Sequence, residues 1–319
     1  MTPQAGISAL SYWYPETQLT IEELHDRGLV ESDPAVLRQL GFDRIHVADP
    51  EELPDLGVFA GRRLLETHDI DPASIDVLIF FSGLEAPAPP SAEHPQATPS
   101  LLDRFRFSAS RLQHQLGLSG ATAFKIYEQG CASLVMALRT ATALVGSGDA
   151  EKVLCIGADF VPPGFSREVI FNVLSDGASA MLIEAGSPSL RPVAFRQITK
   201  GYYWDSPTRR NEIVAAYYPT ARRVILDAVH MAGANTTDIA LFIPDNIGLQ
   251  SWKVLLGLLG IPMEVAFMEN IAAHGHFVSA DSVMNLKDAL ERNPVAGDAL
   301  ILLFTFGFGA NWSAAALRA

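Results

Sequence analysis

The stretch GCASLVMALRTATALVGSGDAEKVLCIGAD, residues 130–159, decides the fold class of this chain. It begins with a glycine and a cysteine, continues in a helical pattern of apolar residues, turns, and ends in the apolar run Val153–Gly157. A helix that leads into a short, continuously apolar strand is typical of a sheet covered by helices. The stretch therefore predicts an α/β layer fold.

The same alternation extends along the chain in both directions. We expect further strands at Val77–Ser82, Ala180–Ile183, Leu241–Pro244 and Leu300–Phe304. Helical patterns cover Leu53–Thr67, Leu101–Leu116, Ala132–Val145, Ala221–Ala232 and Ala280–Glu291. This alternation favours an α/β fold with largely buried strands. The Pro-, Ala- and Ser-rich segment Leu84–Pro99 is predicted to be a surface loop.

Three segments of the first half have counterparts, in the same order, in the second half. Residues 71–83 resemble 235–246, residues 130–159 resemble 276–307, and residues 175–185 resemble 309–319. Repeated units in one order indicate two similar halves, although apolar α/β units can also be alike by chance. We place the halves at residues 1–186 and 187–319.

Composition restricts the class of protein. The chain has 319 residues, of which 49% are apolar and 18% charged, and its formal net charge is −13. The length favours two packed halves, and the apolar content excludes a disordered or coiled-coil protein. An acidic chain argues against a nucleic-acid partner.

Cellular location is inferred from three features. No uninterrupted apolar run reaches the ~18 residues of a spanning helix. The first residues show no basic segment followed by an apolar one, so no signal peptide is evident. Two cysteines, Cys131 and Cys155, cannot form a disulfide framework. We therefore expect a cytoplasmic protein without a membrane partner.

Cys131 is the candidate nucleophile. Gly130 precedes it and a helical pattern follows, which places the sulfur at a helix N-terminus, where unpaired N–H groups favour a thiolate and can hold an oxyanion. A small buried cysteine is the alternative interpretation, and it suits Cys155, which lies inside an apolar strand, much better.

Two of the eight histidines, His274 and His276, flank a glycine just before a predicted helix. Metal binding is a poor interpretation, because the only nearby acids are Glu269 and Asp281 and no cysteine is near, so we expect no metal. A base for the cysteine is the sharper hypothesis. We interpret the remaining histidines as surface or filler residues: His25, His46, His68, His94, His114 and His230.

Two further places invite a functional interpretation. Asp245 ends a predicted strand in LFIPDNIG, where α/β sheets expose functional groups, although an Asx-turn or a helix N-cap would use the same residue. The C-terminal FGFGANWSAAAL, residues 306–317, contains a glycine turn that is either a tight hairpin or a backbone N–H directed at an oxyanion.

Taken in order, these pieces resemble the β-ketoacyl-acyl carrier protein synthase III family of the thiolase fold. The resemblance includes GISALSYWYPETQLTIEEL (6–24), LGFDRIHVA (40–48), the nucleophile stretch, LSDGASAMLIE (174–184) and AAHGHFVSADS (272–282). It implies a five-layered αβαβα protomer of two pseudo-equivalent halves that forms a homodimer, and it makes Cys131 the acyl-accepting cysteine.

The chain departs from the family at the chemical centre. The family histidine that follows a proline is replaced by Asp245, and the family asparagine of a His-Gly-Asn stretch is replaced by His276. An anionic Asp245 would repel the enolate of a decarboxylating condensation unless its pKa were strongly perturbed. The set instead suits a nucleophile, a base and an orienting carboxylate, as in the acyltransferase branch of the family in natural-product pathways.

The resemblance also implies a mechanism and its partners. Cys131 accepts the acyl group, the N–H groups of Cys131 and Phe308 hold the oxyanion, and His276, stabilised by Asp245, deprotonates a hydroxyl, amine or carrier thiol. The donor is an acyl-phosphopantetheine thioester of an acyl carrier protein or of coenzyme A, with no permanently bound cofactor.

Coenzyme A is the less supported donor. The family's nucleotide-gripping positions align with Ala35, Gln39 and Gln250, which carry no charge. A carrier protein would need a basic patch, for which there are two candidate arginine groups: Arg104, Arg106 and Arg111, or Arg209, Arg210, Arg222 and Arg223.

Two other functions compete with an acyltransferase. A condensing enzyme with a rearranged site is opposed by the Asp245 and His276 replacements. A catalytically silent partner subunit is opposed by the intact Cys131.

Overall fold

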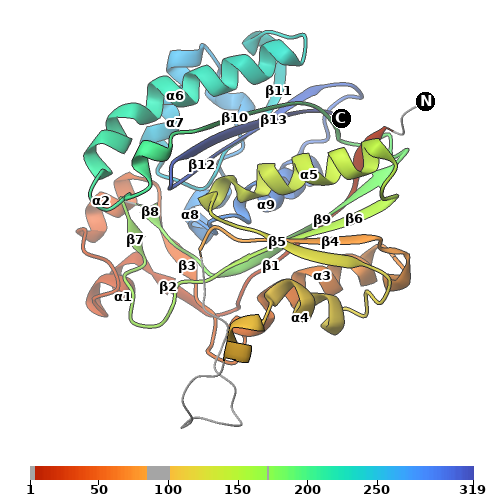
Figure 1. Ribbon diagram of the computed structural model, residues 1–319. Helices are drawn as coiled ribbons and strands as arrows, with labels where there is room; N and C mark the ends of the chain where they lie inside the picture. The colour runs from red at the N-terminus through yellow and green to blue at the C-terminus, as the bar shows by residue number, and fades with distance from the viewer. Residues whose placement is uncertain (1–3, 85–100, 171) are drawn as a thin grey trace.

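Two β-sheets lie at the centre of the molecule, and a computed structural model describes residues 4–84, 101–170 and 172–319 (Figure 1). The first sheet has the strand order β1-β9-β6-β4-β5 and the second the order β10-β13-β12-β11. The strands of the first sheet are β1 (Ala5–Trp13), β4 (Val77–Phe81), β5 (Thr122–Ile126), β6 (Lys152–Asp159) and β9 (Gly177–Ala185). Those of the second are β10 (Arg191–Thr199), β11 (Ile239–Ile243), β12 (Leu300–Gly307) and β13 (Asn311–Arg318).

The four strands of the second sheet repeat four of the five strands of the first, and only β5 has no counterpart among the described residues. In each sheet a parallel pair, β4 with β6 or β11 with β12, is followed by two antiparallel neighbours. The outer antiparallel strand has its register shift at the same place, between Ile7 and Ala9 in β1 and between Pro192 and Ala194 in β10. The repeat predicted from the sequence is therefore confirmed. All strands of the first sheet precede residue 187, and all strands of the second follow it.

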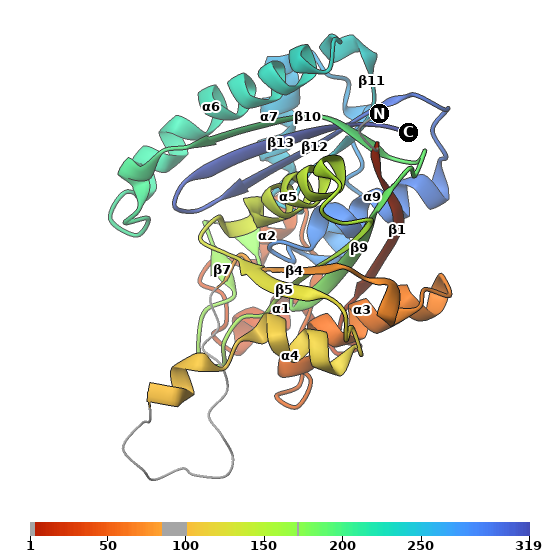
Figure 2. The same cartoon turned by 45° about the vertical axis from the view of Figure 1, so that its right-hand side comes forward.

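Helices and sheets alternate in five layers, as predicted (Figures 1 and 2). Helices α3 (Leu56–Thr67) and α4 (Ser108–Gln115) cover the outer face of the first sheet. Helices α5 (Ser133–Ser147) and α9 (Asp281–Arg292) lie between the sheets, and α6 (Arg210–Met231) and α7 (Leu249–Leu259) cover the second. Shorter helices are α1 (Ile21–Asp26), α2 (Pro34–Gln39) and α8 (Asn270–His274), and the short strands are β2 (Gln18–Thr20), β3 (Arg44–His46), β7 (Glu168–Val169) and β8 (Asn172–Val173).

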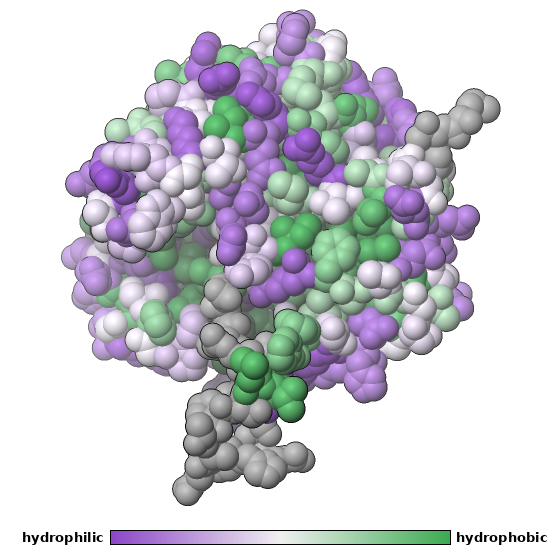
Figure 3. Space-filling model, in the orientation of Figure 1, coloured by the Kyte–Doolittle hydropathy of each residue, from purple (hydrophilic) through white to green (hydrophobic). Residues whose placement is uncertain are grey.

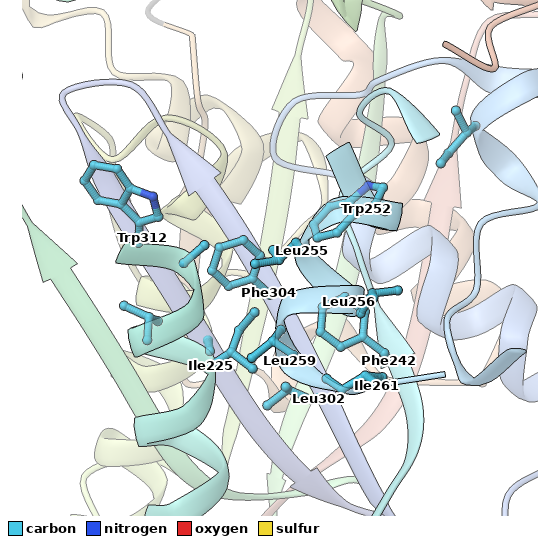
Figure 4. Close-up of a cluster of buried hydrophobic side chains, with 14 of the residues drawn as sticks. Ile225, Phe242, Trp252, Leu255, Leu256, Leu259, Ile261, Leu302, Phe304 and Trp312 are labelled. Carbon is cyan, nitrogen blue, oxygen red and sulfur yellow. The ribbon is translucent and has the colours of Figure 1, made fainter. Parts of the chain in front are cut away.

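The outer layer of the second half is held by an aromatic and aliphatic core. The ring of Trp252 in α7 meets Phe242 of β11 and Phe304 of β12 edge-on, and Figure 4 shows Leu255 and Leu256 beside them. The Trp252 indole donates to the Asp245 carbonyl oxygen at 3.0 Å, so its polar atom is satisfied although it is buried. This core fixes the loop after β11 that carries Asp245.

Helix α5 is apolar on most faces because it packs between the two sheets. It ends at Gly148, whose φ of +82° closes the helix in the left-handed conformation. Gly130–Ser147 is long and apolar enough to cross a membrane by length and composition alone. Contacts of α5 with β4, β6, β9 and β13 account for that composition.

The structure corrects two helix predictions. The helix expected over Leu101–Leu116 is divided into a 3₁₀ helix, η3 (Leu101–Phe105), and α4, because Arg106 and Phe107 lie outside any helix. The helix expected at Ala221–Ala232 begins eleven residues earlier, and Pro219 lies inside it. The predicted loop Leu84–Pro99 falls, apart from Leu84, outside the described residues.

Apolar side chains are exposed at η3 and just after it. Leu101, Leu102, Phe105 and Phe107 are each more than half exposed. Figure 3 shows hydrophobic surface, in green, near the bottom of the view.

Candidate active site

Cys131 lies in a 3₁₀ turn, η4 (Gly130–Ala132), that leads directly into α5. Gly130 has a φ of +54°, and a Cβ there would lie 2.8 Å from the backbone nitrogen of Phe308. A Cβ on Gly307 would lie 1.9 Å from the Gln129 carbonyl oxygen. Because both positions are glycine, the end of β12 can approach the cysteine turn closely. This approach brings the backbone N–H of Phe308 next to the turn.

His276 comes to this cysteine from the other half of the chain. Its Nε2 lies 3.3 Å from the Cys131 Sγ. The backbone N–H of His276 donates to the Val173 carbonyl oxygen at 2.9 Å. Gly275, with a φ of +66°, precedes it, and a Cβ there would lie 2.7 Å from a side-chain carbon of Ile45. Sequence reasoning therefore selected the correct imidazole of the His274–His276 pair for contact with the cysteine.

The carboxylate that contacts His276 is Asp281, not Asp245. His276 Nδ1 is hydrogen-bonded to Asp281 Oδ2, so both ring nitrogens are occupied, one by sulfur and one by this carboxylate. Asp281 also accepts the backbone N–H groups of Phe277 and Asn246, both at 2.7 Å. The predicted orienting contact of Asp245 with His276 is therefore corrected. Asp281 was noticed in the sequence only as an unconvincing metal ligand.

Asp245 remains part of the site, in another position. Its side chain is buried and accepts the Phe306 N–H at 3.3 Å and the Ser282 hydroxyl at 3.4 Å. The N-cap of the following helix is Gly248, so Asp245 does not cap it. Its participation in catalysis stays a prediction.

The pKa values of the His276 imidazole and the Cys131 thiol depend on each other. Burial disfavours the imidazolium, but the Asp281 carboxylate and the Cys131 sulfur outweigh burial and raise the pKa of His276 well above its usual value. Burial raises the pKa of the Cys131 thiol, while His276 opposes that increase. The imidazolium of His276 thus stabilises a Cys131 thiolate, and the thiolate stabilises the imidazolium.

Asp245 is affected more simply. Burial and the nearby Asp281 carboxylate raise the pKa of Asp245 well above its usual value, against the opposing effect of His276. The protonated, neutral form of Asp245 therefore persists to higher pH than in an ordinary aspartate. The expected repulsion between Asp245 and the enolate of a condensation requires an ionised Asp245. The raised pKa therefore weakens this argument against a condensing enzyme.

Another buried carboxylate, Asp159, holds the segment that follows His276. It accepts the backbone N–H of Ser279 at 3.1 Å and also the Ser279 hydroxyl. It further accepts the Ser82 hydroxyl and the N–H groups of Gly83 and Leu84, at 2.8 to 2.9 Å. Asp159 therefore connects the end of β6, the end of β4 and the segment between His276 and α9. Nothing in the sequence singled it out.

The other histidines among the described residues do not line the cavity at Cys131, but His46 is neither at the surface nor without polar contacts. His46 is only 1% exposed, and its Nε2 lies 2.9 Å from the Nδ1 of His274. Its Nδ1 lies 2.7 Å from the Pro15 carbonyl oxygen. His94 is outside the described residues. Over the described ranges no group of three His, Cys, Asp or Glu side chains is placed to hold a metal ion.

A cavity of about 610 Å³ opens onto Cys131, Asp245 and His276. Its wall is mainly apolar and aromatic, and no Lys or Arg is among the described residues that line it. Ligand sites of this size typically combine an apolar wall with a few polar groups. The wall includes Leu84, Val169, Ile170, Leu174, Trp204, Ile213, Val214, Tyr217, Tyr218, Ile247, Val278, Phe306 and Phe308.

Three of the seven arginines considered for a carrier protein lie within ion-pair distance of a carboxylate. Arg111 pairs with Asp55 at 2.5 Å and Arg209 with Glu212 at 2.8 Å. Arg223 lies 3.8 Å from Asp227. Ala35 and Gln39 lie on α2, and Gln250 on α7, where they offer no charge to a nucleotide. The donor stays a prediction.

Comparison with known families identifies two matching regions. Residues 127–201 match the family model of 3-oxoacyl-(acyl-carrier-protein) synthase III. Residues 229–319 match the model of the C-terminal part of the same synthase. The two regions together cover more than half of the chain and include the cysteine turn and the His276 segment.

Individual relatives extend over nearly the whole chain. A β-ketoacyl-(acyl-carrier-protein) synthase III of Roseiflexus sp. (strain RS-1) is 26% identical, covering 98% of this chain and 99% of the relative. The structure of 3-oxoacyl-(acyl-carrier-protein) synthase III from Aquifex aeolicus superposes with a TM-score of 0.83 at 23% identity, over 99% and 100% of the two chains. A structure described as the acyltransferase ChlB3 superposes with a TM-score of 0.82 at 19% identity, over 99% and 98%. These superpositions establish the fold.

Proposed function

Because the chain belongs to the 3-oxoacyl-(acyl-carrier-protein) synthase III family, we propose that it is a thioester-dependent acyltransferase acting through Cys131. The observation that carries the proposal is the use of both His276 nitrogens, one by the Cys131 sulfur and one by the Asp281 carboxylate. A nucleophile, a base and a carboxylate in this order perform two-step acyl transfer on unrelated folds.

In the loading step the Cys131 Sγ attacks the donor thioester carbonyl and its proton passes to His276 Nε2. The carbonyl oxygen, which becomes negative, accepts hydrogen bonds from the Cys131 and Phe308 N–H groups. The C–S bond of the donor then breaks, and the leaving thiolate takes the proton from the imidazolium. The Asp281 carboxylate stabilises the imidazolium during the interval.

In the transfer step the same imidazole changes role. In the acyl-enzyme the Cys131 sulfur is bonded to the acyl group and carries no negative charge. It therefore no longer raises the pKa of His276, so the imidazole is more readily neutral in the acyl-enzyme than in the free enzyme. It can then remove the proton of a hydroxyl, amine or carrier thiol as that group attacks the acyl carbonyl. The Cys131–acyl bond breaks, and the thiol recovers its proton from His276.

The remaining parts of the proposal rest on the family resemblance. They are a pantetheine thioester donor, a homodimer, a role in natural-product biosynthesis and a cytoplasmic location. The absence of Lys and Arg from the described cavity wall disfavours a malonyl carboxylate there. The fold also accommodates a protein described as an acyltransferase.

Condensation is the second candidate. Two observations favour it: the relatives are called β-ketoacyl synthases, and a neutral Asp245 can donate a hydrogen bond to an enolate oxygen. A condensing enzyme would consume a malonyl thioester and release carbon dioxide, whereas the proposed acyltransferase leaves malonyl thioesters unchanged.

Intact-mass measurement separates these functions. The protein is incubated with acyl-pantetheine, acyl-coenzyme A and acyl-carrier-protein thioesters, and Cys131→Ala and Cys155→Ala serve as matched controls. We expect one acyl mass in the wild type and in Cys155→Ala, none in Cys131→Ala, and loss of that mass once an acceptor is added. Malonyl consumption with carbon dioxide release would establish the condensing enzyme instead, and absence of any acyl mass would favour a silent partner.

A further inference from the structure

Val278, two residues after His276, has a backbone conformation that its side chain disfavours. Its φ is +57°, in the left-handed region, where a β-branched residue is a genuine outlier. Strained conformations of this kind persist only where the surrounding structure imposes them, and they cluster at active sites and ligand clamps. Val278 lines the cavity that opens onto Cys131, so the strain lies at the candidate active site.

Two buried carboxylates hold the residues on either side of Val278. The Phe277 N–H donates to Asp281 at 2.7 Å, and the Ser279 N–H donates to Asp159 at 3.1 Å. The Ser279 hydroxyl also donates to Asp159. Both acids are themselves at most 1% exposed. The peptide groups around Val278 are thus fixed, and the direction of its side chain is fixed with them.

The Val278 side chain packs beside the turn that carries Cys131. A Cβ on Gly83 would lie 2.5 Å from the Val278 Cγ1 and 3.0 Å from the Gly130 carbonyl carbon, so the isopropyl group and the turn meet over this glycine. Cys131 and Val278 belong to one apolar cluster, and they are only 9% and 4% exposed. The cavity wall is therefore tightly packed beside the sulfur.

We infer that Val278 restricts the acyl group on Cys131 to one without a branch at the carbon next to the thioester carbonyl. That carbon is two bonds from the sulfur, so it occupies the part of the cavity nearest to Cys131. A methyl branch there adds volume against a wall whose backbone is fixed, and overpacking of this kind is unfavourable. The inference rests on the proposed function. We expect the wild type to load an α-branched acyl group at least about tenfold more slowly than its straight-chain isomer.

The test compares the rates at which butyryl-pantetheine and isobutyryl-pantetheine load the enzyme, followed by intact mass. Val278→Gly removes the isopropyl group, so we expect the butyryl-to-isobutyryl rate ratio to fall about tenfold relative to the wild type. Val214→Ala is the control, because Val214 of α6 lines the same cavity outside the cluster that contains Cys131. Its ratio should stay that of the wild type.

Two outcomes would overturn the inference. An unchanged ratio in Val278→Gly, including equal slowing of both thioesters, would assign Val278 to the support of His276 instead of to selection of the acyl group. An equal fall of the ratio in Val214→Ala would show that any loss of bulk from the cavity wall has the same effect.

Substitution also tests whether the backbone holds Val278 in place. Glycine adopts a positive φ without strain, whereas alanine keeps the Cβ that disfavours it. Val278→Gly should therefore melt at a higher temperature than Val278→Ala, although it removes one carbon more. The reverse order would show that the side chain is not held in this position and would contradict the inference.

Alkylation of Cys131 distinguishes failure of the inference from failure of the proposed function. The Cys131 thiolate displaces iodide from iodoacetamide and from 2-iodopropanamide, and only the second reagent places a methyl branch next to the sulfur. If no thioester acylates the wild type, the acyltransferase proposal fails, and the alkylation rates still test Val278. We expect the ratio of the two rates, measured by mass with Cys131→Ala as the blank, to fall about tenfold in Val278→Gly. An unchanged alkylation ratio would exclude Val278 as the group that crowds the sulfur.

Discussion

His276 Nε2 lies 3.3 Å from Cys131 Sγ, although the two residues are 145 positions apart in the chain. The cysteine comes from the turn before α5, and the histidine comes from the segment before α9. Since α5 and α9 are the two helices between the sheets, their N-terminal ends bring the two halves of the chain together at one reactive pair (Figure 1).

Asp281→Asn tests which carboxylate supports His276. We expect transfer to slow by about 10²–10⁴-fold, because an amide can hold the wrong imidazole tautomer and cannot stabilise the imidazolium. The pH dependence of the transfer rate should also shift in a defined direction. Asp281 raises the pKa of His276, so its removal should move the acid limb of the transfer rate to lower pH. Single-turnover transfer rates measured across pH check both effects.

The matched control is Asp245→Asn. An asparagine has the shape of Asp245, and its amide oxygen can still accept the Phe306 N–H, so we expect a loss of about tenfold or less. If Asp245→Asn loses more activity than Asp281→Asn, Asp245 recovers the orienting role first expected for it.

His276→Ala should block transfer, whereas His274→Ala should not. His276 contacts the cysteine, while His274 contacts His46 and does not line the described cavity wall. Loss of a general base costs roughly 10²–10⁴-fold in rate. Deacylation of preloaded enzyme measures the effect, and a larger loss in His274→Ala would show that the wrong imidazole was chosen.

Asp176→Asn should destabilise the fold. Asp176 forms a buried bidentate pair with Arg167, at 2.7 and 3.0 Å, and also accepts the N–H groups of Ala48 and Val161. Removing one charge leaves the buried guanidinium uncompensated, so we expect the free energy of unfolding to fall by about 3–5 kcal/mol. Urea denaturation measures it.

The control for that variant is Asp227→Asn. Asp227 pairs with Arg196 at the surface, at 2.9 Å and with both side chains about one third exposed. Its removal should change the free energy of unfolding by less than about 1 kcal/mol. Similar losses in the two variants would contradict the distinction between the buried and the exposed pair.

Acid should destabilise the protein through His46. Burial lowers the pKa of His46 from 6.5 to about 4, so between these values the unfolded chain binds more protons than the folded one. The free energy of unfolding should therefore fall as pH decreases from about 6.5 to about 4. Denaturation at several pH values should give a shallower slope for His46→Gln, and an unchanged slope would exclude this residue as the cause.

Sequence alone indicated the α/β class, the two similar halves and two of the three groups of the candidate site. Apolar strands alternating with helices predict an α/β fold, and their repetition in one order predicts two similar halves, whereas the five layers followed from the family resemblance. Cys131 was recognisable because the signal is local: a glycine before it and a helix after it. His276 was recognisable because it follows a glycine and precedes a helix, in a segment that resembles a known family.

Tertiary structure alone decided the rest of the site. Asp281 and Asp245 are both acids near strand or helix ends in the sequence, and only the path of the loop between His276 and α9 turns Asp281 toward the imidazole. The raised pKa of Asp245 arises from burial beneath residues distant in the chain and from the nearby Asp281 carboxylate. Local sequence patterns predict which helices and strands form. The pKa of a side chain and its hydrogen-bond partners depend instead on the residues that pack around it in the folded protein.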